Sequence, residues 1–234
     1  MRARQRHIQW RDGCGLYLDS RYINQSNASA VSSWSDRSGN LRNATNATTA
    51  EQPIYTTNAI NGNGAVEFDG SNDRLIGPSV AWGTVATVFF VAKTDDTAGA
   101  KGQYVFWDGN TSTGGVSFHF GVLYGYATFF GRGWSPGNPY AKSNVLATAG
   151  AWLMGSSELS SASNLWVDGR VPTSTSVGNG SMANLSYAFC IGFENFWRFD
   201  GQIGLVAIFG SSLSASLRRR YESAAAYSFK LACS

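Results

Sequence analysis

Apolar and polar positions alternate along much of this chain, and short polar turns separate the alternating stretches. Residues 116–122 (VSFHFGV) show this period of two, which indicates a β-strand with one buried face. Turns at 61–64 (NGNG) and 69–73 (DGSND) flank a short strand at 65–68. Asn-Gly and Asp-Gly pairs adopt positive φ at low cost, so this pattern predicts antiparallel strands joined by tight turns.

One stretch is apolar on both faces. Residues 84–93 (TVATVFFVAK) are β-branched and aromatic, as expected of a central strand that is covered on both sides. Further strands are predicted at 16–18, 104–107, 124–131, 151–156, 164–167, 187–193 and 202–209. Many short strands with regularly spaced turns favour an all-β sandwich.

A single helix is predicted at the end of the chain. Its apolar stripe repeats every four residues, at Leu213, Leu217, Tyr221 and Ala225, and Ser214 precedes it as a candidate N-cap. Residues 218–220 (RRR) interrupt the stripe, and two of these arginines must face solvent. We expect the helix to pack as a lid on the sandwich edge with a basic outer face.

Composition supports a sizeable core, because 43% of the residues are apolar and 14% are aromatic. Only 14% are charged, against about 25% in an average globular protein. Polarity comes instead from Ser, Thr, Asn and Gly, as in many extracellular and virion proteins. We expect an arm at residues 1–12 followed by one domain at residues 13–234.

The net charge of +3 is concentrated in the arm, where four arginines precede the first acidic residue: Arg2, Arg4, Arg6 and Arg11. The arm could be a solvated terminus or could order against an acidic neighbouring subunit. Nucleic acid is not an expected partner, because the rest of the chain has no basic stripe.

Three cysteines are too few for a disulfide framework. Cys190 lies within an apolar strand and is expected to be buried, whereas a bridge between Cys14 and Cys233 would require the termini to meet. Residues 1–11 lack the apolar core of an export signal, and no apolar run is long enough for a membrane span. We therefore expect synthesis in the cytosol and no membrane contact.

Several segments resemble the concanavalin A-like lectin/glucanase superfamily, in particular its laminin-G-like branch in bacteria and phages. They are listed in order: residues 32–55, NAINGNGAVEFDGSNDRL (58–75), NLWVDGR (164–170) and FDGQIGLVAIFGSSLSASLRRRYE (199–222). The resemblance covers nearly the whole chain after Asp12. It implies a jelly-roll sandwich of two antiparallel sheets with one C-terminal helix, and it is specific for fold rather than for ligand.

Catalysis is not expected. Glucanases of this superfamily place paired carboxylates on one strand, and glycoside hydrolysis needs two carboxyl groups across a cleft. Glu67 with Asp69 is the nearest approach, and Asp69 belongs to a turn. Asp36, Asp108 and Asp168 could contribute to a calcium site but fit structural turns better, so we predict no metal and no cofactor.

Sugar binding would need exposed aromatic rings that stack on pyranose faces, with polar side chains that hold hydroxyls. Three patches are candidates, listed in order: Arg132, Trp134, Asn138 and Tyr140; Asn195, Trp197 and Arg198; and Trp107 with Asp108. These aromatic residues could instead be plugs that pack under the loops. His119 is expected on an exposed sheet face.

The favoured hypothesis is a non-enzymatic, lectin-like component of a phage virion surface, either a head decoration or a tail protein. Its partners would be other virion proteins, bound through the basic arm, and it would be a homo-oligomer or bound to a lattice. Attachment to host or environmental glycans is its expected activity. The alternative is a secreted or cell-surface bacterial adhesion module.

Overall fold

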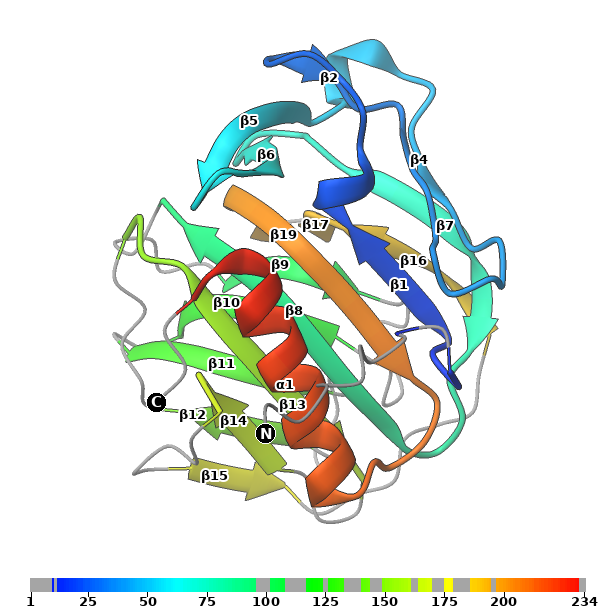
Figure 1. Ribbon diagram of the computed structural model, residues 1–234, viewed down its shortest axis with the longest axis vertical. Coiled ribbons are helices and arrows are strands. Elements are labelled where there is room, and N and C mark those ends of the chain that lie inside the picture. Colours follow the sequence, from blue (N-terminus) through cyan, green and yellow to red (C-terminus); the bar gives the residue numbers. More distant parts are fainter. Residues whose placement is uncertain are drawn as a thin grey trace, which may run out of the picture.

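Two antiparallel β-sheets face each other in the computed structural model, and one helix lies across the outer side of one sheet (Figure 1). This confirms the predicted jelly-roll-like sandwich with a C-terminal helix. The structure describes residues 10, 12–95, 102–107, 117–123, 126–132, 140–143, 149–160, 164–169, 175–178, 186–194 and 197–231.

The eight-stranded sheet has the order β14-β13-β8-β19-β6-β5-β2, with β1 paired to β19. Its strands are β1 (Leu16–Asp19), β2 (Ser29–Ala30), β5 (Ile54–Ile60), β6 (Asn63–Asp69), β8 (Ala86–Thr94), β13 (Leu153–Leu159), β14 (Asn164–Val167) and β19 (Asp200–Phe209). As the sequence predicted, β8 is buried along almost its whole length, because it lies between β13 and β19 and is covered on both faces.

The nine-stranded sheet has the order β15-β12-β11-β10-β9-β16-β7-β4-β3. Its strands are β3 (Ser33–Trp34), β4 (Ala44–Thr45), β7 (Leu75–Ala81), β9 (Gly102–Trp107), β10 (Ser117–Leu123), β11 (Tyr126–Arg132), β12 (Tyr140–Ser143), β15 (Thr175–Gly178) and β16 (Ser186–Ile191). A separate hairpin joins β17 (Phe193–Glu194) to β18 (Trp197–Arg198).

The main core lies between the two sheets and is rich in aromatic residues. Phe106 and Phe189 stack with ring centroids 5.4 Å apart, and Trp82 packs edge-on against Phe106 at 6.0 Å. Cys190 is buried, as predicted, although it lies outside this core cluster.

A second core lies between the eight-stranded sheet and α1 (Ala215–Phe229). The predicted N-cap is confirmed, since the Ser214 side chain accepts a hydrogen bond from the backbone N–H of Leu217. The predicted position at the sandwich edge is wrong, because α1 lies across the sheet face in front of β13 and β8 (Figure 1). Its buried side chains also pack against those of β19. Phe229 packs so closely over Gly204 of β19 that a Cβ there would lie 2.9 Å from its ring.

Trp10 also belongs to this second core, a role that the sequence pattern did not reveal. Its ring stacks on Tyr17 at 5.3 Å and contacts Phe89 edge-on at 5.5 Å and Tyr221 at 4.8 Å. The indole is 6% exposed. The segment before β1 is therefore anchored to α1 and to the sheet at Trp10.

Candidate functional site

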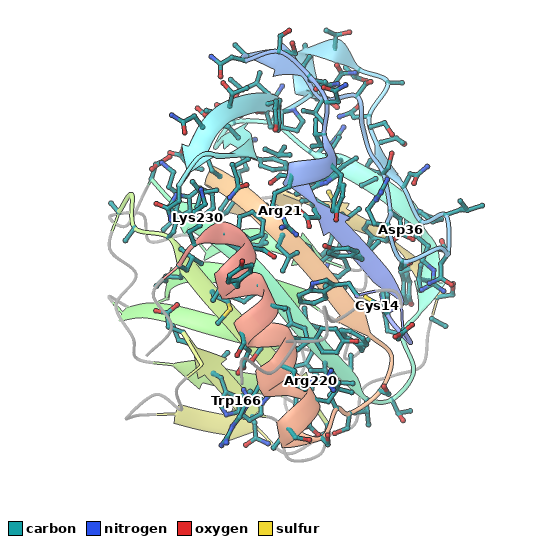
Figure 2. All side chains as sticks on the ribbon, in the orientation of Figure 1. Cys14, Arg21, Asp36, Trp166, Arg220 and Lys230 are labelled. Atoms are coloured by element: carbon teal, nitrogen blue, oxygen red, sulfur yellow. The ribbon has the colours of Figure 1, made fainter. Side chains whose placement is uncertain are left out.

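A hollow of about 620 Å³ lies at the C-terminal end of α1, where the helix meets the 3-10 helix η1 (Ser20–Tyr22). It is lined by Arg21, Ala226, Tyr227, Ser228, Lys230 and Leu231. Figure 2 shows Arg21 and Lys230 beside each other above this end of the helix. We call it the Arg21–Lys230 hollow.

Arg21 is held in place by Asp19, the residue that caps η1. The Asp19 carboxylate accepts hydrogen bonds from the backbone N–H of Arg21 at 3.0 Å, from its Nε at 3.0 Å and from its Nη2 at 2.6 Å. Tyr17 donates its hydroxyl to the same carboxylate at 2.5 Å. Asp19 is 1% exposed, so this buried carboxylate fixes the guanidinium at the surface.

One edge of the Arg21 guanidinium is left available. Nε and Nη2 bind Asp19, whereas Nη1 has no acceptor among the described residues. The guanidinium carbon lies 5.0 Å from the centroid of the Phe229 ring, which supports it from below. The result is a rigid cation with free N–H donors at the hollow.

Lys230 is placed by the C-terminal cap of α1. It adopts the left-handed conformation with φ 52°, and its backbone N–H bonds to carbonyls of the last helical turn. Its Nζ donates to the carbonyl of Asn61 at 2.9 Å. This bond ties the ammonium to the β5–β6 turn, where Asn61 and Gly62 both have positive φ, as their sequence predicted.

The same turn satisfies the exposed carbonyls at the helix end. Asn61 donates its Nδ2 to the carbonyls of Phe229 and Lys230, each at 3.0 Å, and Asn63 donates to that of Ser228 at 3.1 Å. These are the carbonyl groups that an α-helix leaves without internal partners. The turn therefore fixes both the end of α1 and the wall of the hollow.

The hollow carries a net positive charge. Burial lowers the pKa of Arg21, but hydrogen bonding and charge attraction to Asp19 raise it on balance, so the guanidinium stays charged. Burial and the Asp19 carboxylate raise the pKa of Tyr17, which keeps its hydroxyl as a donor. Two cations and one carboxylate thus leave one positive charge at this surface.

The outer face of the nine-stranded sheet is a second candidate surface. Trp107 is half-buried, lies opposite Cys190 in register, and belongs to neither core cluster. Cys190 in turn lies opposite Ile76, which is 43% exposed. Residues directly opposite each other share a face, so these three side chains form one row across the outer face. We call it the Trp107 row.

Beyond this row, the sheet continues to the strands that carry two predicted sugar-binding residues. In the backbone register, Phe118 of β10 lies opposite Phe106 of β9 and opposite Gly131 of β11. Arg132 follows Gly131 and pairs with Tyr140 of β12. Adjacent strands are about 4.8 Å apart, which puts β12 about 14 Å from β9.

The second predicted patch also adjoins β9. The β17–β18 hairpin, which carries Trp197 and Arg198, contacts this strand. Arg198 is exposed. The hairpin backbone thus lies next to the strand that carries Trp107. The remaining predicted positions lie outside the described residues or side chains: Arg2, Arg4, Arg6, Arg11, Asp108, His119, Trp134, Asn138, Asn195 and Cys233, together with the side chains of Arg132, Tyr140 and Trp197.

The acidic residues considered for catalysis or calcium have structural partners where they are described. Asp36 accepts from the backbone N–H groups of Tyr17 at 2.9 Å, Ser38 at 2.9 Å and Arg42 at 3.0 Å, which confirms its predicted role in a turn. Glu67 accepts from Thr56 at 2.6 Å. Within the described residues, no three His, Cys, Asp or Glu side chains gather as metal ligands.

Two further findings bear on chemistry. Burial raises the pKa of the Cys14 thiol to about 12, so this cysteine is a poor nucleophile. No helix in the described part of the chain is long and apolar enough to cross a membrane.

Sequence reasoning missed the Arg21–Lys230 hollow entirely. Its two cations come from opposite ends of the chain, and neither lies in a charged cluster or a recognisable motif. The one usable signal is the Asn-Gly pair at 61–62, whose sequence predicts a turn but does not indicate a helix cap.

By sequence, no protein-family model and no curated protein matches the chain. By structure, it is similar to domain 4 of AbnA, an extracellular GH43 arabinanase from Geobacillus stearothermophilus solved in complex with arabinotriose. The TM-score is 0.63 at 14% identity, and the match covers 91% of this chain and 98% of that domain.

Toxin domains match as well. The receptor-binding domain of botulinum neurotoxin D gives a TM-score of 0.60 at 14% identity, covering 92% of this chain and 53% of that chain. The binding domain of Paraclostridial Mosquitocidal Protein 1 gives 0.59 at 11% identity, with 92% and 52% covered. The chain therefore spans about half the length of these toxin domains. All these likenesses show the shared fold.

Proposed function

We propose that this protein is a non-enzymatic carbohydrate-binding module whose sugar site is the Trp107 row. The observation that carries the proposal is the similarity to domain 4 of the arabinanase. That domain was solved with arabinotriose bound, and the match covers 98% of it. This chain therefore has the architecture of a whole sugar-bound domain.

The Trp107 row has the features that a sugar platform requires. A half-buried indole on a sheet face offers a flat apolar surface for the C–H face of a sugar ring. Ile76 extends the apolar surface on one side, and β10, β11 and β12 continue the sheet on the other. The spread from β9 to β12 suits an oligosaccharide better than a single sugar.

The test measures binding of arabino-oligosaccharides by isothermal titration calorimetry. Trp107→Ala should weaken binding about tenfold or more, a loss of about 1.4 kcal/mol, and Trp107→Phe should retain most of it. Tyr22→Ala, which removes an aromatic side chain 55% exposed on the other layer, is the matched control. Unchanged binding by folded Trp107→Ala protein would exclude this platform.

The sequence also led to a prediction that Trp134→Ala with Trp197→Ala weakens glycan retention while the fold persists. That double variant distinguishes loop contacts from the sheet platform in the same assay. The virion-surface role and the adhesin alternative stay predictions, with co-sedimentation of the protein with particles, before and after deletion of the arginine arm, as their test.

A further inference from the structure

We propose that the Arg21–Lys230 hollow binds the carboxylate of an acidic sugar residue, so that this domain selects glycans containing uronic or sialic acids. The inference rests on the proposed carbohydrate-binding function but assigns a second site, on the opposite sheet from the Trp107 row. The hollow opens beside α1, whereas the row lies on the outer face of the nine-stranded sheet.

The charge at the hollow selects a ligand with one negative charge. Arg21 and Lys230 supply two cations, and Asp19, whose side chain is fully buried, neutralises one of them. The negative end of the helix dipole would oppose an anion, but the carbonyls there already accept hydrogen bonds from Asn61 and Asn63. The remaining charge of about +1 matches a carboxylate better than a phosphate, which carries close to two charges at neutral pH.

The donors are fixed before any ligand arrives. Asp19 holds Nε and Nη2 of Arg21, which leaves Nη1 as the available edge. Asn61 holds one hydrogen of the Lys230 ammonium, which has three, at 2.9 Å. Because both cations are positioned already, little conformational entropy is lost when a carboxylate binds between them.

The rest of the hollow suits a sugar ring. Tyr227 is 76% exposed at the rim, and Leu231 and Ala226 line the wall. An exposed tyrosine ring can stack on the C–H face of a pyranose, and Ser228 offers a hydroxyl. A uronic or sialic acid carries a carboxylate beside the C–H face of its ring. These two features complement the cations and the tyrosine ring of the hollow.

The test is an NMR titration of the ¹⁵N-labelled full chain with sodium glucuronate, and with glucose as the neutral counterpart. Glucuronate should shift the resonances of Arg21, Tyr227 and Lys230, and glucose should not. Lys230→Gln should raise the Kd for glucuronate about tenfold, as expected for a lost charged hydrogen bond. Arg220→Gln should leave it within about twofold.

The Arg220 variant is a matched control, because it removes the same charge from an exposed position on α1 (Figure 2). Ten residues of helix separate it from Lys230, about 15 Å. If both variants weaken binding equally, the attraction is non-specific and the inference fails. It also fails if glucuronate and glucose shift the same resonances equally.

Two further arms separate this inference from the proposed function and from another anion source. Arabino-oligosaccharide binding at the Trp107 row with no glucuronate response would overturn this inference alone. Loss of oligosaccharide binding from the row, with the hollow still responding to glucuronate, would overturn the proposed platform alone. Binding to phosphatidylserine vesicles that depends on Lys230, without a glucuronate response, would replace the sugar by a lipid headgroup.

Discussion

Two arginine–carboxylate pairs lie at α1, one in the first half of the helix and one beside its C-terminal end, and they differ in how much of the arginine they leave exposed. Arg218 pairs with Glu222, and both side chains are 5% exposed. Arg21 pairs with Asp19, and its side chain is 24% exposed while that of Asp19 is fully buried. The same chemistry therefore anchors the helix at one end and offers a cation to solvent at the other.

The surroundings explain the difference. The Arg218 guanidinium lies 3.7 Å from the centroid of the Trp166 ring, and its Nε has no acceptor among the described residues. Ser156 also donates to the Glu222 carboxylate. The Arg21 guanidinium rests on the edge of the layer at Phe229, with one side open. A closed pair serves stability, and an open pair can serve recognition.

The largest expected effect comes from breaking the closed pair. Arg218→Met removes the only cation paired with Glu222 among the described residues and should lower the free energy of unfolding by about 3–5 kcal/mol, because it leaves a buried, uncompensated carboxylate. Urea denaturation followed by tryptophan fluorescence measures this loss.

A control and a rescue sharpen that result. Arg219→Met removes an exposed arginine next to it and should change the free energy of unfolding by less than about 0.5 kcal/mol. Arg218→Met with Glu222→Leu should recover most of the loss, since an apolar pair of similar volume often replaces a buried ion pair. No recovery would mean that Arg218 acts through its stacking on Trp166 rather than through its charge.

Breaking the open pair should cost less. Arg21→Met should lower the free energy of unfolding by about 1.5–3 kcal/mol, the range for hydrogen bonds to a charged group. Asp19 would keep the hydroxyl of Tyr17 and the backbone N–H of residue 21. The same urea titration gives the comparison, and a larger loss than in Arg218→Met would reverse the proposed division between the two pairs.

The sequence predicted those parts of the fold that depend on local chemistry. Asn61-Gly62 adopts positive φ, Ser214 caps α1, and β8 is covered on both faces, because turn preference, capping and periodicity act over a few residues. The second core was not predictable in this way. The contact between Trp10 and Phe89 joins segments that are far apart in the sequence, so no local pattern signals it.

The candidate sites show the same contrast between local residue type, which the sequence reveals, and contacts between distant segments, which it does not. Residue type alone predicts Trp107 as a candidate, but only the strand register places it in one row with Cys190 and Ile76. The sequence predicted that two of the arginines at 218–220 face solvent, and Arg219 and Arg220 are exposed. It did not predict that Trp166 and Glu222 hold the third, Arg218, in a buried position. The Arg21–Lys230 hollow depends on contacts between distant segments, for which periodicity gives no signal.

A smaller effect tests how the open end of the helix is supported. Asn63→Ala removes the hydrogen bond to the Ser228 carbonyl and should lower the free energy of unfolding by about 1 kcal/mol. The last turn of α1 should also lose protection in hydrogen exchange. Unchanged protection there would show that Asn61 alone suffices to cap the helix end.

The smallest expected effect concerns Asp73, a carboxylate that has the carboxylate of Asp69 beside it instead of an arginine. Burial, and then the negative charge of Asp69, raise the pKa of Asp73 to about 6, from an ordinary value of about 3.9. The folded state then binds more protons than the unfolded state between about pH 4 and pH 6, so this group makes stability fall as pH rises through that window.

Asp73→Asn keeps an acceptor for the backbone N–H of Asp69, which Asp73 now binds at 3.0 Å. Because Asp73 is half-buried and screened by solvent, the variant should gain at most about 1 kcal/mol at pH 7 and nothing at pH 4. Thermal denaturation at both pH values measures the difference, and an equal gain at pH 4 would assign the effect to packing instead of charge.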